Sequence, residues 1–525
     1  MKFPMLLCLI LLYYFLSIVD GLKVLVCYPL PVKSVSILGQ GVVRNLLEAG
    51  HEVTYMTVYP LKNPPTKNFR QIDISSNTAL VAGDQMLSIE YILNNKLEKT
   101  SSRDIQLFGQ EAARMTLNHE NVIKLLEDPN EHFDVILTDL LESELYSGFA
   151  VVYECPMTWV YSMGAHWQVL RMIDVATSPA YDPDYLSSNT NPLSFTERVD
   201  ELWTRIQWQF FKTFFTQPEE RRIYEAVFGP VLVKRGGTLP DYEDVIYNAS
   251  LIFGNEYDAV RNRPSTPQNF KYIGGIHIEE PVTPLPKDLQ DLIDNSKHGV
   301  IYFSMGSFLQ SKTLPRKVIM ELLQMFGKFK QTVIWKFEDN SLQDVQKNVH
   351  IVNWAPQPSI LAHPNVKMFL THGGLFSSIE AVHFGVPTIG IPVLFDQITN
   401  VNKAVLNGYA LKVELSHNLA KDLKAAINVV LSDDRYTKKA KELSAIYHDR
   451  LTKPGLALAY WVEHVVRTCG ALHLRSPALH VPLHQRLYLD LLVIILTTTF
   501  ALVFLLRRLC QKRNGIEYYG QKKSN

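Results

Sequence analysis

Residues 353–400, which decide the fold, read NWAPQPSILAHPNVKMFLTHGGLFSSIEAVHFGVPTIGIPVLFDQITN. Within them, an apolar run at 366–370 is followed by the letters THGG at 371–374, and a helical pattern then begins at Ser377. This order predicts a buried strand, a glycine-rich turn and the N-terminus of a helix.

A turn of this kind binds anions. The first N–H groups of a helix have no partner inside the helix, and the helix dipole adds positive potential there. Gly373 and Gly374 let a phosphate approach the backbone, and His372 adds a hydrogen-bond donor. For this motif taken alone, the alternative is a plain strand–helix connection with an incidental histidine.

Two further residues suit a nucleotide. Trp354 follows an apolar run at 349–352 and offers a flat ring on which a base can stack. Glu380 lies about one turn into the helix, where its carboxylate can accept hydrogen bonds from sugar hydroxyls. The joint pattern W-x-P-Q, H-x-G-x-x-S-x-x-E and D-Q therefore predicts a nucleotide-sugar site more specifically than any of its parts.

These motifs closely resemble the signature of the UDP-glycosyltransferase family, the membrane-bound enzymes of the UDP-glucuronosyltransferase and UDP-glucosyltransferase type. The resemblance extends over nearly the whole chain. It implies an α/β fold of the GT-B type, in which two doubly wound Rossmann-like domains face a cleft, plus one C-terminal transmembrane helix. It also implies inverting transfer of glucose or glucuronate from a UDP-sugar, the co-substrate, to a small lipophilic acceptor, as in detoxification. No further cofactor and no metal are expected.

The resemblance also assigns roles to individual residues. Trp354 and Gln357 would hold uracil, and Glu380 the ribose. Asp396 and Gln397 would orient the donor sugar. The full set of UDP-binding positions is Ser307, Trp354, Gln357, His372, Gly374, Ser377, Ser378 and Glu380. Ser307 follows a second strand-and-turn pattern; it binds phosphate or acceptor unless it is a plain turn serine.

Strands and helices alternate in both halves of the chain. Helical periodicity predicts helices at 37–49, ending at Gly50, and over much of 96–126. This alternation predicts doubly wound parallel sheets, whose ligands collect beyond the carboxyl ends of the strands. The loop at 29–36 is therefore a candidate site loop. The expected strands are 23–28, 52–58, 133–140, 158–162, 299–303, 332–337, 366–370 and 387–392.

A valine occupies the position of the family's catalytic base. In the family, a histidine follows the serine of the first loop and deprotonates the acceptor, and an aspartate at a later strand end orients it. Here Ser34 is followed by Val35, which takes no proton, whereas Asp139 matches the aspartate. His51 lies at the far end of the predicted helix and does not replace the base. The alternative for Asp139 is a strand-end or capping role.

The segment 163–215 is rich in aromatic residues. An aromatic acceptor pocket and a membrane-facing surface are two interpretations, and ordinary core packing is expected to explain most of these side chains. Asp182 and Asp184 form a D-x-D that we interpret as a turn, not a metal site. Asn248 begins a glycosylation sequon. The aromatic residues concerned are Trp167, Trp203, Trp208, Phe210, Phe211, Phe214 and Phe215.

Both ends of the chain carry targeting patterns. A basic residue, a short apolar core and Gly21 predict a cleavable secretory signal, with an uncleaved anchor as the alternative. An apolar run at 488–506 is followed at once by Arg507, which predicts a single-pass, type I protein with lumenal domains and a cytosolic tail. Lys522 and Lys523 resemble a di-lysine retrieval signal for the endoplasmic reticulum membrane; a merely charged tail is the alternative.

The expected segments follow from these patterns. Proline-rich residues around Gly274-Gly275 predict the interdomain linker. The family resemblance implies that the helix near 456–467 crosses back onto the first domain. The segments are a signal peptide at 1–21, an acceptor-binding domain at 22–265, a linker at 266–286, a UDP-sugar-binding domain at 287–450, returning helices at 451–487, a transmembrane helix at 488–506 and a tail at 507–525.

Composition excludes several classes of protein. The 525 residues contain 52 basic and 52 acidic side chains, so nothing indicates a nucleic-acid partner. Five cysteines provide neither metal-ligand spacing nor a disulfide framework. Cys27, Cys155 and Cys469 are expected as thiols, although one bridge is compatible with the sequence.

Two functions from different classes fit the sequence. The first is a glycosyltransferase that either favours nitrogen or already ionised nucleophiles or turns over very slowly, because Val35 cannot deprotonate a hydroxyl. The second is a catalytically lapsed protein that binds UDP-sugar or lipophilic ligands and modulates a paralogue in hetero-oligomers. Glucose or glucuronate, and homo- or hetero-oligomers, stay open. A soluble, secreted lectin-like protein is disfavoured by the anchor and the tail.

Overall fold

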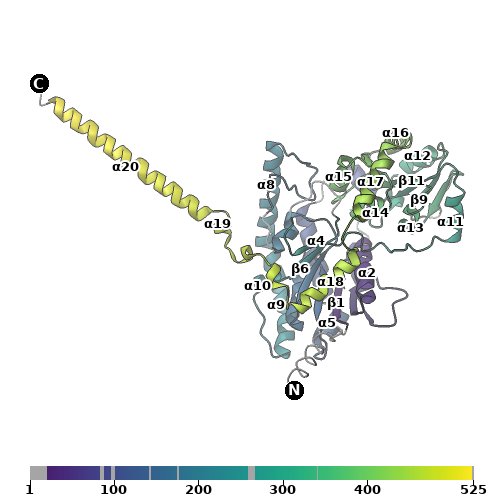
Figure 1. The fold of residues 1–525 in the computed structure, drawn as a ribbon, viewed down its shortest axis with the longest axis horizontal. Coiled ribbons are helices and arrows are strands. Elements are labelled where there is room, and N and C mark those ends of the chain that lie inside the picture. The colour runs from purple at the N-terminus through teal and green to yellow at the C-terminus, as the bar shows by residue number, and fades with distance from the viewer. Residues whose placement is uncertain are drawn as a thin grey trace, which may run out of the picture. The chain divides into compact units, whose positions relative to one another are not determined.

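A computed structural model describes residues 21–82, 88–95, 101–140, 143–173, 177–257, 266–339 and 341–522. The chain divides into two compact units, of which the first ends at Arg475 and the second begins at Ser476. The first unit contains two parallel sheets flanked by helices. In Figure 1 the first sheet is drawn in purple to blue and the second in teal to green.

The first sheet has seven described strands in the order β3-β2-β1-β4-β5-β6-β7, all paired in parallel. Strands buried on both faces are typical of doubly wound sheets, and β1, β4 and β5 are apolar runs of this kind. The strands are β1 Lys23–Tyr28, β2 Glu52–Thr57, β3 Phe69–Asp73, β4 Val135–Asp139, β5 Met157–Tyr161, β6 Leu251–Gly254 and β7 Phe270–Tyr272.

The second sheet has six described strands in the order β10-β9-β8-β11-β12-β13, again all parallel. The strands are β8 Val300–Ser304, β9 Thr332–Lys336, β10 Val349–Val352, β11 Val366–Thr371, β12 Thr388–Gly390 and β13 Ala410–Lys412.

Strand order reverses at one place in each sheet, between β1 and β4 in the first and between β8 and β11 in the second. Ligands of doubly wound sheets bind outside the carboxyl ends of the strands at such switch points. Val35 lies in the first turn of α2 after β1, Asp139 is the last residue of β4, and Ser307 and His372 lie in the turns after β8 and β11. The topology therefore brings the sequence-predicted residues to the two positions where a ligand is expected.

Helices cover both sheets. Those of the first half are α2 Lys33–Glu48, α3 Ile89–Asn95, α4 Ser102–Leu117, α5 Glu120–Glu127, α6 Gly148–Tyr153, α7 Trp167–Leu170, α8 Phe195–Phe211, the π-helix η5 Lys212–Thr216, α9 Gln217–Lys234 and α10 Tyr242–Ile246. Those of the second half are α11 Lys287–Asp294, α12 Arg316–Phe326, α13 Gln357–Leu361, α14 Leu375–His383, α15 Gln397–Leu406, α16 Leu419–Ser432, α17 Arg435–His448 and α18 Pro454–Arg467.

Most expected elements are present, but several boundaries were wrong. α2 begins at Lys33, not at residue 37, because Val35 continues the buried stripe of Leu38 and Val42 backwards by one turn. Much of the candidate loop at 29–36 is therefore helix. The expected helix over 96–126 is two helices, since the chain breaks at Asn118 and at His119, whose side chain caps α5.

Part of the predicted linker belongs to the first sheet. β7 lies within the proline-rich segment and pairs with β6 from Phe270 to Tyr272. Prolines on either side of so short a strand obscured it in the sequence. The strand β13 was not predicted, because three residues are too few to show a period.

The predicted return of the last helix onto the first sheet is confirmed. Leu458, Val462 and Val465 of α18 are buried in one hydrophobic cluster with residues of β1 and α2. Figure 1 shows α18 beside α2. The C-terminal part of the first unit thereby stabilises its N-terminal sheet.

The aromatic segment does not behave as mostly core. Trp167 and Trp208 are buried, but several others are exposed, so the expectation of ordinary packing was wrong for those. The exposed side chains recur with a helical period on one face of α8 and η5, which matches an amphipathic surface. They are Phe195, Val199, Leu202, Trp203, Ile206, Phe210, Phe214 and Phe215.

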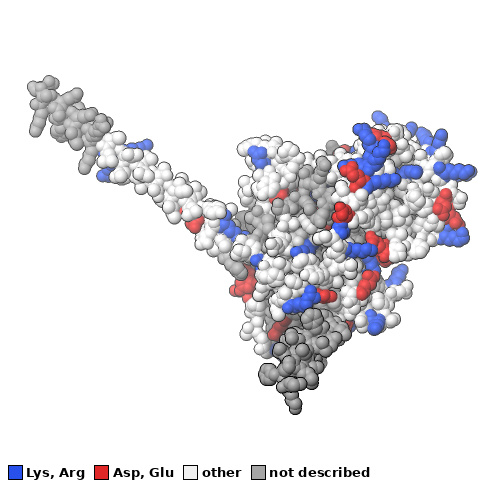
Figure 2. Space-filling model, viewed as in Figure 1, with Lys and Arg blue, Asp and Glu red and all other residues white. Residues whose placement is uncertain are grey.

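The second unit contains α19 Leu483–Arg486 and the long helix α20 Leu489–Lys522. Within α20, the 23 residues Leu489–Gln511 are long and apolar enough to cross a membrane. The most apolar stretch of this segment is not buried against the rest of the protein. In Figure 2 this part of the helix is almost wholly white, whereas charged side chains are spread over the first unit. Residues 1–20 of the signal predicted at 1–21 and the final residues 523–525 lie outside the described residues.

Candidate active site

The turn between β11 and α14 carries several of the residues that were predicted to bind the diphosphate. Gly373 has a φ of +82°, which glycine adopts without strain, and α14 begins directly after Gly374. Gly374 is the N-cap and makes no side-chain cap, so the first backbone N–H groups of α14 face outward from the helix end. Ser377 is buried and Ser378 is half-buried in the first turn.

His372 lies between two glycines. A Cβ placed on Gly306 would come within 2.5 Å of His372 Cε1, and one placed on Gly374 within 2.5 Å of Nε2. Gly306, with a φ of +87°, belongs to the turn after β8 that also carries Ser307. The loops after β8 and β11 thus approach the same imidazole from two sides, and only glycine fits at either contact.

The imidazole of His372 is neutral at physiological pH. Burial lowers its pKa to about 4, and the nearby Lys336 contributes in the same direction. Lys336 is itself buried; it donates to the Gly306 carbonyl over 2.8 Å and pairs with Glu338 over 2.5 Å. A neutral imidazole retains one N–H, so His372 offers a hydrogen bond, not a positive charge, to an anion.

Gln357 and Glu380 form one hydrogen-bond network. Gln357 Nε2 donates to Glu380 Oε2 over 2.6 Å and to Ser377 Oγ over 3.0 Å, and Tyr302 OH donates to Gln357 Oε1 over 3.2 Å. His277 Nε2 lies 3.1 Å from Glu380 Oε1. Sequence reasoning missed Tyr302 and His277, because each comes from an element far from the 353–400 motif.

Trp354 is exposed, as a stacking residue must be, but its ring is not bare. Lys33 Nζ lies 3.5 Å from the ring centroid and Lys336 Nζ lies 5.6 Å from it. Lys33 opens α2, so this cation–π contact joins the first sheet to the second. An incoming base would share or replace this contact.

Asp396 and Gln397 lie just beyond β12, where they were predicted to bind the sugar. Asp396 precedes α15, and burial raises its pKa, although its bond to Asn400 acts in the opposite direction. Gln397 Oε1 accepts from the backbone N–H groups of Val393 and Leu394, over 2.9 and 3.1 Å. These two bonds fix the orientation of the Gln397 amide.

On the first sheet, Val35 follows β1 and Asp139 ends β4, the two strands that flank the switch point. Val35 is buried in the cluster that contains Tyr28 and Leu38. Asp139, also buried, ends β4; burial raises the pKa of Tyr28, and Asp139 raises it further, which places this carboxylate near Tyr28. The position of Val35 therefore has no group that takes a proton.

Comparison with known proteins agrees with this geometry. The family model described as "UDP-glucoronosyl and UDP-glucosyl transferase" matches residues 24–522. This chain belongs to that family. It is 29% identical to UDP-glucosyltransferase 2 of Dactylopius coccus, over 96% of each chain. It is 28% identical to human UDP-glucuronosyltransferase 2B10 over 75% of this chain and 72% of the relative.

Solved structures show the same fold. The glycotransferase of kitacinnamycin has a TM-score of 0.55 at 17% identity, covering 86% of this chain and 99% of its own. CalG4, the calicheamicin glycosyltransferase, has a TM-score of 0.54 at 16% identity, covering 85% and 99%. The predicted GT-B architecture with two Rossmann-type sheets is confirmed, and the chain is a UDP-glycosyltransferase by family.

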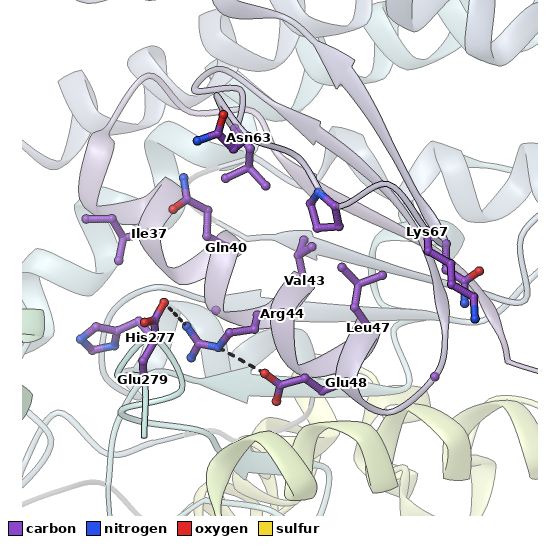
Figure 3. A pocket seen from close by; sticks show the side chains of 15 residues that line it. Ile37, Gln40, Val43, Arg44, Leu47, Glu48, Asn63, Lys67, His277 and Glu279 are labelled. Atoms are coloured by element: carbon purple, nitrogen blue, oxygen red, sulfur yellow. Dashed lines mark hydrogen bonds and ion pairs between the residues drawn. The ribbon is translucent and has the colours of Figure 1, made fainter. Parts of the chain in front are cut away.

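In this chain, a groove with a volume of about 750 Å³ lies beside α2. Figure 3 shows Ile37, Gln40 and Arg44 on one wall and His277 with Glu279 on another. Arg44 pairs with Glu279 over 3.2 Å. The described lining contains none of the predicted site residues, so we do not place substrate there. His277 nevertheless connects this groove to Glu380.

One group of residues far apart in sequence is arranged like metal ligands. Glu280, His383 and His448 each place a potential ligand atom within 4.8 Å of the others. Sequence spacing could not reveal it, because the residues come from three elements. Lys453 pairs with Glu280 over 2.7 Å, so that carboxylate already has a cationic partner.

The remaining predicted features lie away from the switch points. Asn248 is exposed, as a glycosylation site requires, and its side-chain oxygen accepts from Arg475 over 2.6 Å. Asp184 accepts from the Trp167 indole N–H over 2.8 Å, in keeping with a structural turn. The described cysteines, Cys27, Cys155, Cys469 and Cys510, are free thiols.

Proposed function

We propose that this chain transfers glucose or glucuronate from a UDP-sugar to a small lipophilic acceptor, with inversion at the anomeric carbon. The acceptor's lone pair bonds to that carbon while the bond to the UDP oxygen breaks. Negative charge then develops on UDP, and the N–H groups of α14 and His372 are suited to stabilise it. Fixed donors of this kind lower the barrier without reorganising during the reaction.

Val35 is the observation that carries the finer part of the proposal. General-base catalysis contributes roughly 10²–10⁴-fold, and a neutral hydroxyl acceptor loses that factor when valine replaces the base. An amine attacks through its free lone pair and releases its proton to solvent afterwards. A phenolate or thiolate has no proton to lose. Nitrogen or already ionised nucleophiles are therefore the preferred acceptors.

A second candidate is a lapsed enzyme that binds the nucleotide and modulates a catalytic paralogue in hetero-oligomers. The buried Val35 favours it as well, because a valine in place of the base removes proton transfer and leaves the predicted nucleotide-binding residues unchanged. This candidate predicts that UDP binds and that no product forms.

We propose that the protein is located in the membrane of the endoplasmic reticulum. A single span at Leu489–Gln511 suits a type I protein of the endoplasmic reticulum with lumenal domains and a cytosolic tail. A glycan on exposed Asn248 would report the lumenal side. Enzyme digestion that removes such a glycan, with Asn248→Gln as control, tests this topology.

The deciding experiment measures UDP release by isolated membranes that contain the wild-type chain or Val35→His. Each UDP-sugar is supplied with phenols, alcohols, amines and azoles. We expect wild-type turnover on nitrogen acceptors and a gain on phenols and alcohols of at least about tenfold only in Val35→His.

Two other results have distinct meanings. Equal wild-type rates on neutral hydroxyl and nitrogen acceptors would contradict the role assigned to Val35. UDP binding by both forms without any turnover would favour the lapsed enzyme.

A further inference from the structure

A small cavity with polar walls lies beyond the carboxyl ends of β4 and β5. Its volume is about 20 Å³, enough for one water-sized group. The walls come from α4, from the residues that follow both strands, and from α7, α8 and η5. The lining residues that the argument uses are Gln106, Leu140, Glu144, His166, Gln168, Arg171 and Lys212.

Two buried glutamines present one amide atom each to this cavity. Gln106 Oε1 accepts from Thr216 over 3.1 Å, which leaves its NH₂ group without a partner among the described residues. Gln168 donates through its NH₂ group to Asp184 over 3.4 Å, which leaves its carbonyl oxygen without one. The bonded end of each amide fixes the direction of the other end. One glutamine therefore offers a donor and the other an acceptor.

His166 and Arg171 repeat this arrangement. His166 Nε2 lies 2.6 Å from Tyr161 OH, and its Nδ1 is buried with no partner in the described chain. Arg171 uses one terminal nitrogen for Tyr247, over 3.2 Å, and the other for Glu144, while its Nε–H has no described partner. Buried polar atoms are nearly always bonded, so four such atoms around one cavity indicate a ligand group that completes them.

The charges around the cavity are paired. Lys212 forms ion pairs with Glu144 and, over 2.8 Å, with Glu220, and Arg171 forms another with Glu144. Burial alone would raise the pKa of Glu144, but Lys212 and Arg171 outweigh burial and lower it to about 2. Two cations thus face two carboxyl groups, which suits a neutral ligand group better than an ion.

A π-helical turn builds part of this wall. Within η5, Lys212 and Thr216 are buried, whereas Phe214 and Phe215 between them are exposed. The wider turn directs Lys212 and Thr216 inward, where Lys212 pairs with Glu144 and Thr216 donates to Gln106. Such turns are common at functional sites, and this one shapes the cavity.

Neighbouring residues connect the cavity to both sets of predicted reacting residues. Leu140, which lines it, directly follows Asp139. His166 packs against Tyr185 with ring centroids 4.4 Å apart, and the Tyr185 carbonyl accepts from Thr399 over 3.0 Å. Thr399 belongs to α15, which begins at the predicted sugar-binding Gln397. An acceptor poised beside the donor sugar can therefore extend a substituent into this cavity.

We propose that the cavity binds one neutral oxygen function of the acceptor, a hydroxyl or carbonyl remote from the nucleophile. The identification of the ligand as an acceptor rests on the proposed function. The acceptor is then amphipathic, with a lipophilic body and one polar end. A site built to bond a hydroxyl rejects the analogue that lacks it, because its own polar groups are left unpaired.

Binding, not turnover, tests this proposal. The probes are 4-(hydroxyalkyl)anilines of increasing chain length, each compared with the 4-alkylaniline of equal length. Calorimetry on the full chain in detergent, with UDP present, gives both dissociation constants. We expect the hydroxylated member of one length to bind about tenfold more tightly than its partner. In Gln106→Met and in Gln168→Met, the ratio of the two dissociation constants should fall to within about twofold.

Gln110→Met is the matched control, since Gln110 lies one turn further along α4, bonds the Thr216 carbonyl and does not line the cavity. Its ratio should equal that of the wild type. Equal wild-type affinity for both members at every length would mean that the cavity holds an ordered water only, which overturns the proposal. UDP release from each UDP-sugar, measured separately with the same protein preparations, tests catalysis. Absent turnover with a preserved binding preference therefore contradicts only the proposed reaction.

Discussion

At the scale of single residues, the predicted diphosphate site depends on how closely two loops approach His372. Gly306 and Gly374 each leave room only for hydrogen on the side facing the imidazole. Sequence reasoning identified Gly374 from its motif, but it had no reason to select Gly306, which lies in another loop. Gly306 has to be glycine for two reasons, its positive φ and its contact with His372.

Substitution by alanine distinguishes the effect of the positive φ of Gly306 from the effect of its contact with His372. Gly306→Ala should lower UDP affinity at least about tenfold, because the new methyl group displaces the His372 ring that is expected to bind phosphate. Gly236→Ala is the control, since Gly236 has a similar φ of +79° with nothing within 4 Å of the added Cβ. Isothermal titration with UDP measures the affinity. An equal loss in both variants would show that backbone strain, not the contact with His372, is responsible.

Buried histidines should make the fold sensitive to acid. Burial lowers the pKa of His383 to about 4, whereas an unfolded histidine titrates near 6.5. Between these pH values the unfolded state binds more protons, so the free energy of unfolding falls as pH falls. By pH 5 the loss amounts to about 2 kcal/mol for one such group. Stability due to neutral His383 is thus complete above pH 6.5 and lost toward pH 4.

The corresponding measurement is denaturant unfolding at pH 7 and pH 5. His383→Gln should lose about 2 kcal/mol less than the wild type between these values. His417→Gln, at an exposed histidine, should follow the wild type. Parallel losses in all three proteins would contradict the assignment to His383.

At the scale of elements, the contact between α18 and α2 joins the end of the first unit to its first sheet. A Cβ placed on Gly455 would lie 1.6 Å from Asn45 Oδ1, and Asn45 Nδ2 donates to the Gly41 carbonyl over 2.8 Å. The two helices can therefore approach this closely only while residue 455 has no side chain.

Gly455→Ala should destabilise the protein by about 1–3 kcal/mol, since Asn45 must move and break its bond. In Asn45→Ala/Gly455→Ala the loss should be smaller than the sum of the single losses, because the clash is gone. Gly237→Ala, whose added Cβ would meet Leu232 at 3.5 Å, is the control for an uncrowded glycine. Chemical unfolding monitored by circular dichroism measures the wild type, the two single variants at Asn45 and Gly455, the double variant and the control. Strict additivity of the two single losses would argue against the clash.

At the scale of the whole molecule, the sequence predicted the sheets better than the site. Apolar runs and glycine turns have short-range signatures, so β8, β11 and α14 were found close to their true positions. His277 reaches Glu380 across 103 positions of sequence, and no local pattern records such a contact. The cavity near Gln106 depends on a π-helical turn, which has no periodicity of its own to detect.

The division of the chain into two units leads to a prediction about its anchor. Among the described residues, the five hydrophobic clusters lie within 22–474, whereas the large apolar side chains of Leu489–Gln511 are exposed. A chain that ends at Arg475 should therefore keep cooperative unfolding and UDP affinity within about twofold of the full chain, because no core contact is removed. Its residue 475 also keeps its bonds to Asn248.

The membrane behaviour of that shortened chain should change completely. Leu489–Gln511 spans about 35 Å as a helix, enough to cross the hydrocarbon core of a bilayer. The full chain should stay in the membrane pellet after alkaline carbonate extraction, and the chain ending at Arg475 should be released. If the short chain also stays in the pellet, the exposed apolar face of α8 and η5 holds it on the membrane. The double substitution Phe210→Ser/Phe214→Ser in the short chain should then release it. A short chain that folds yet stays bound despite this double change would contradict the role assigned to α20.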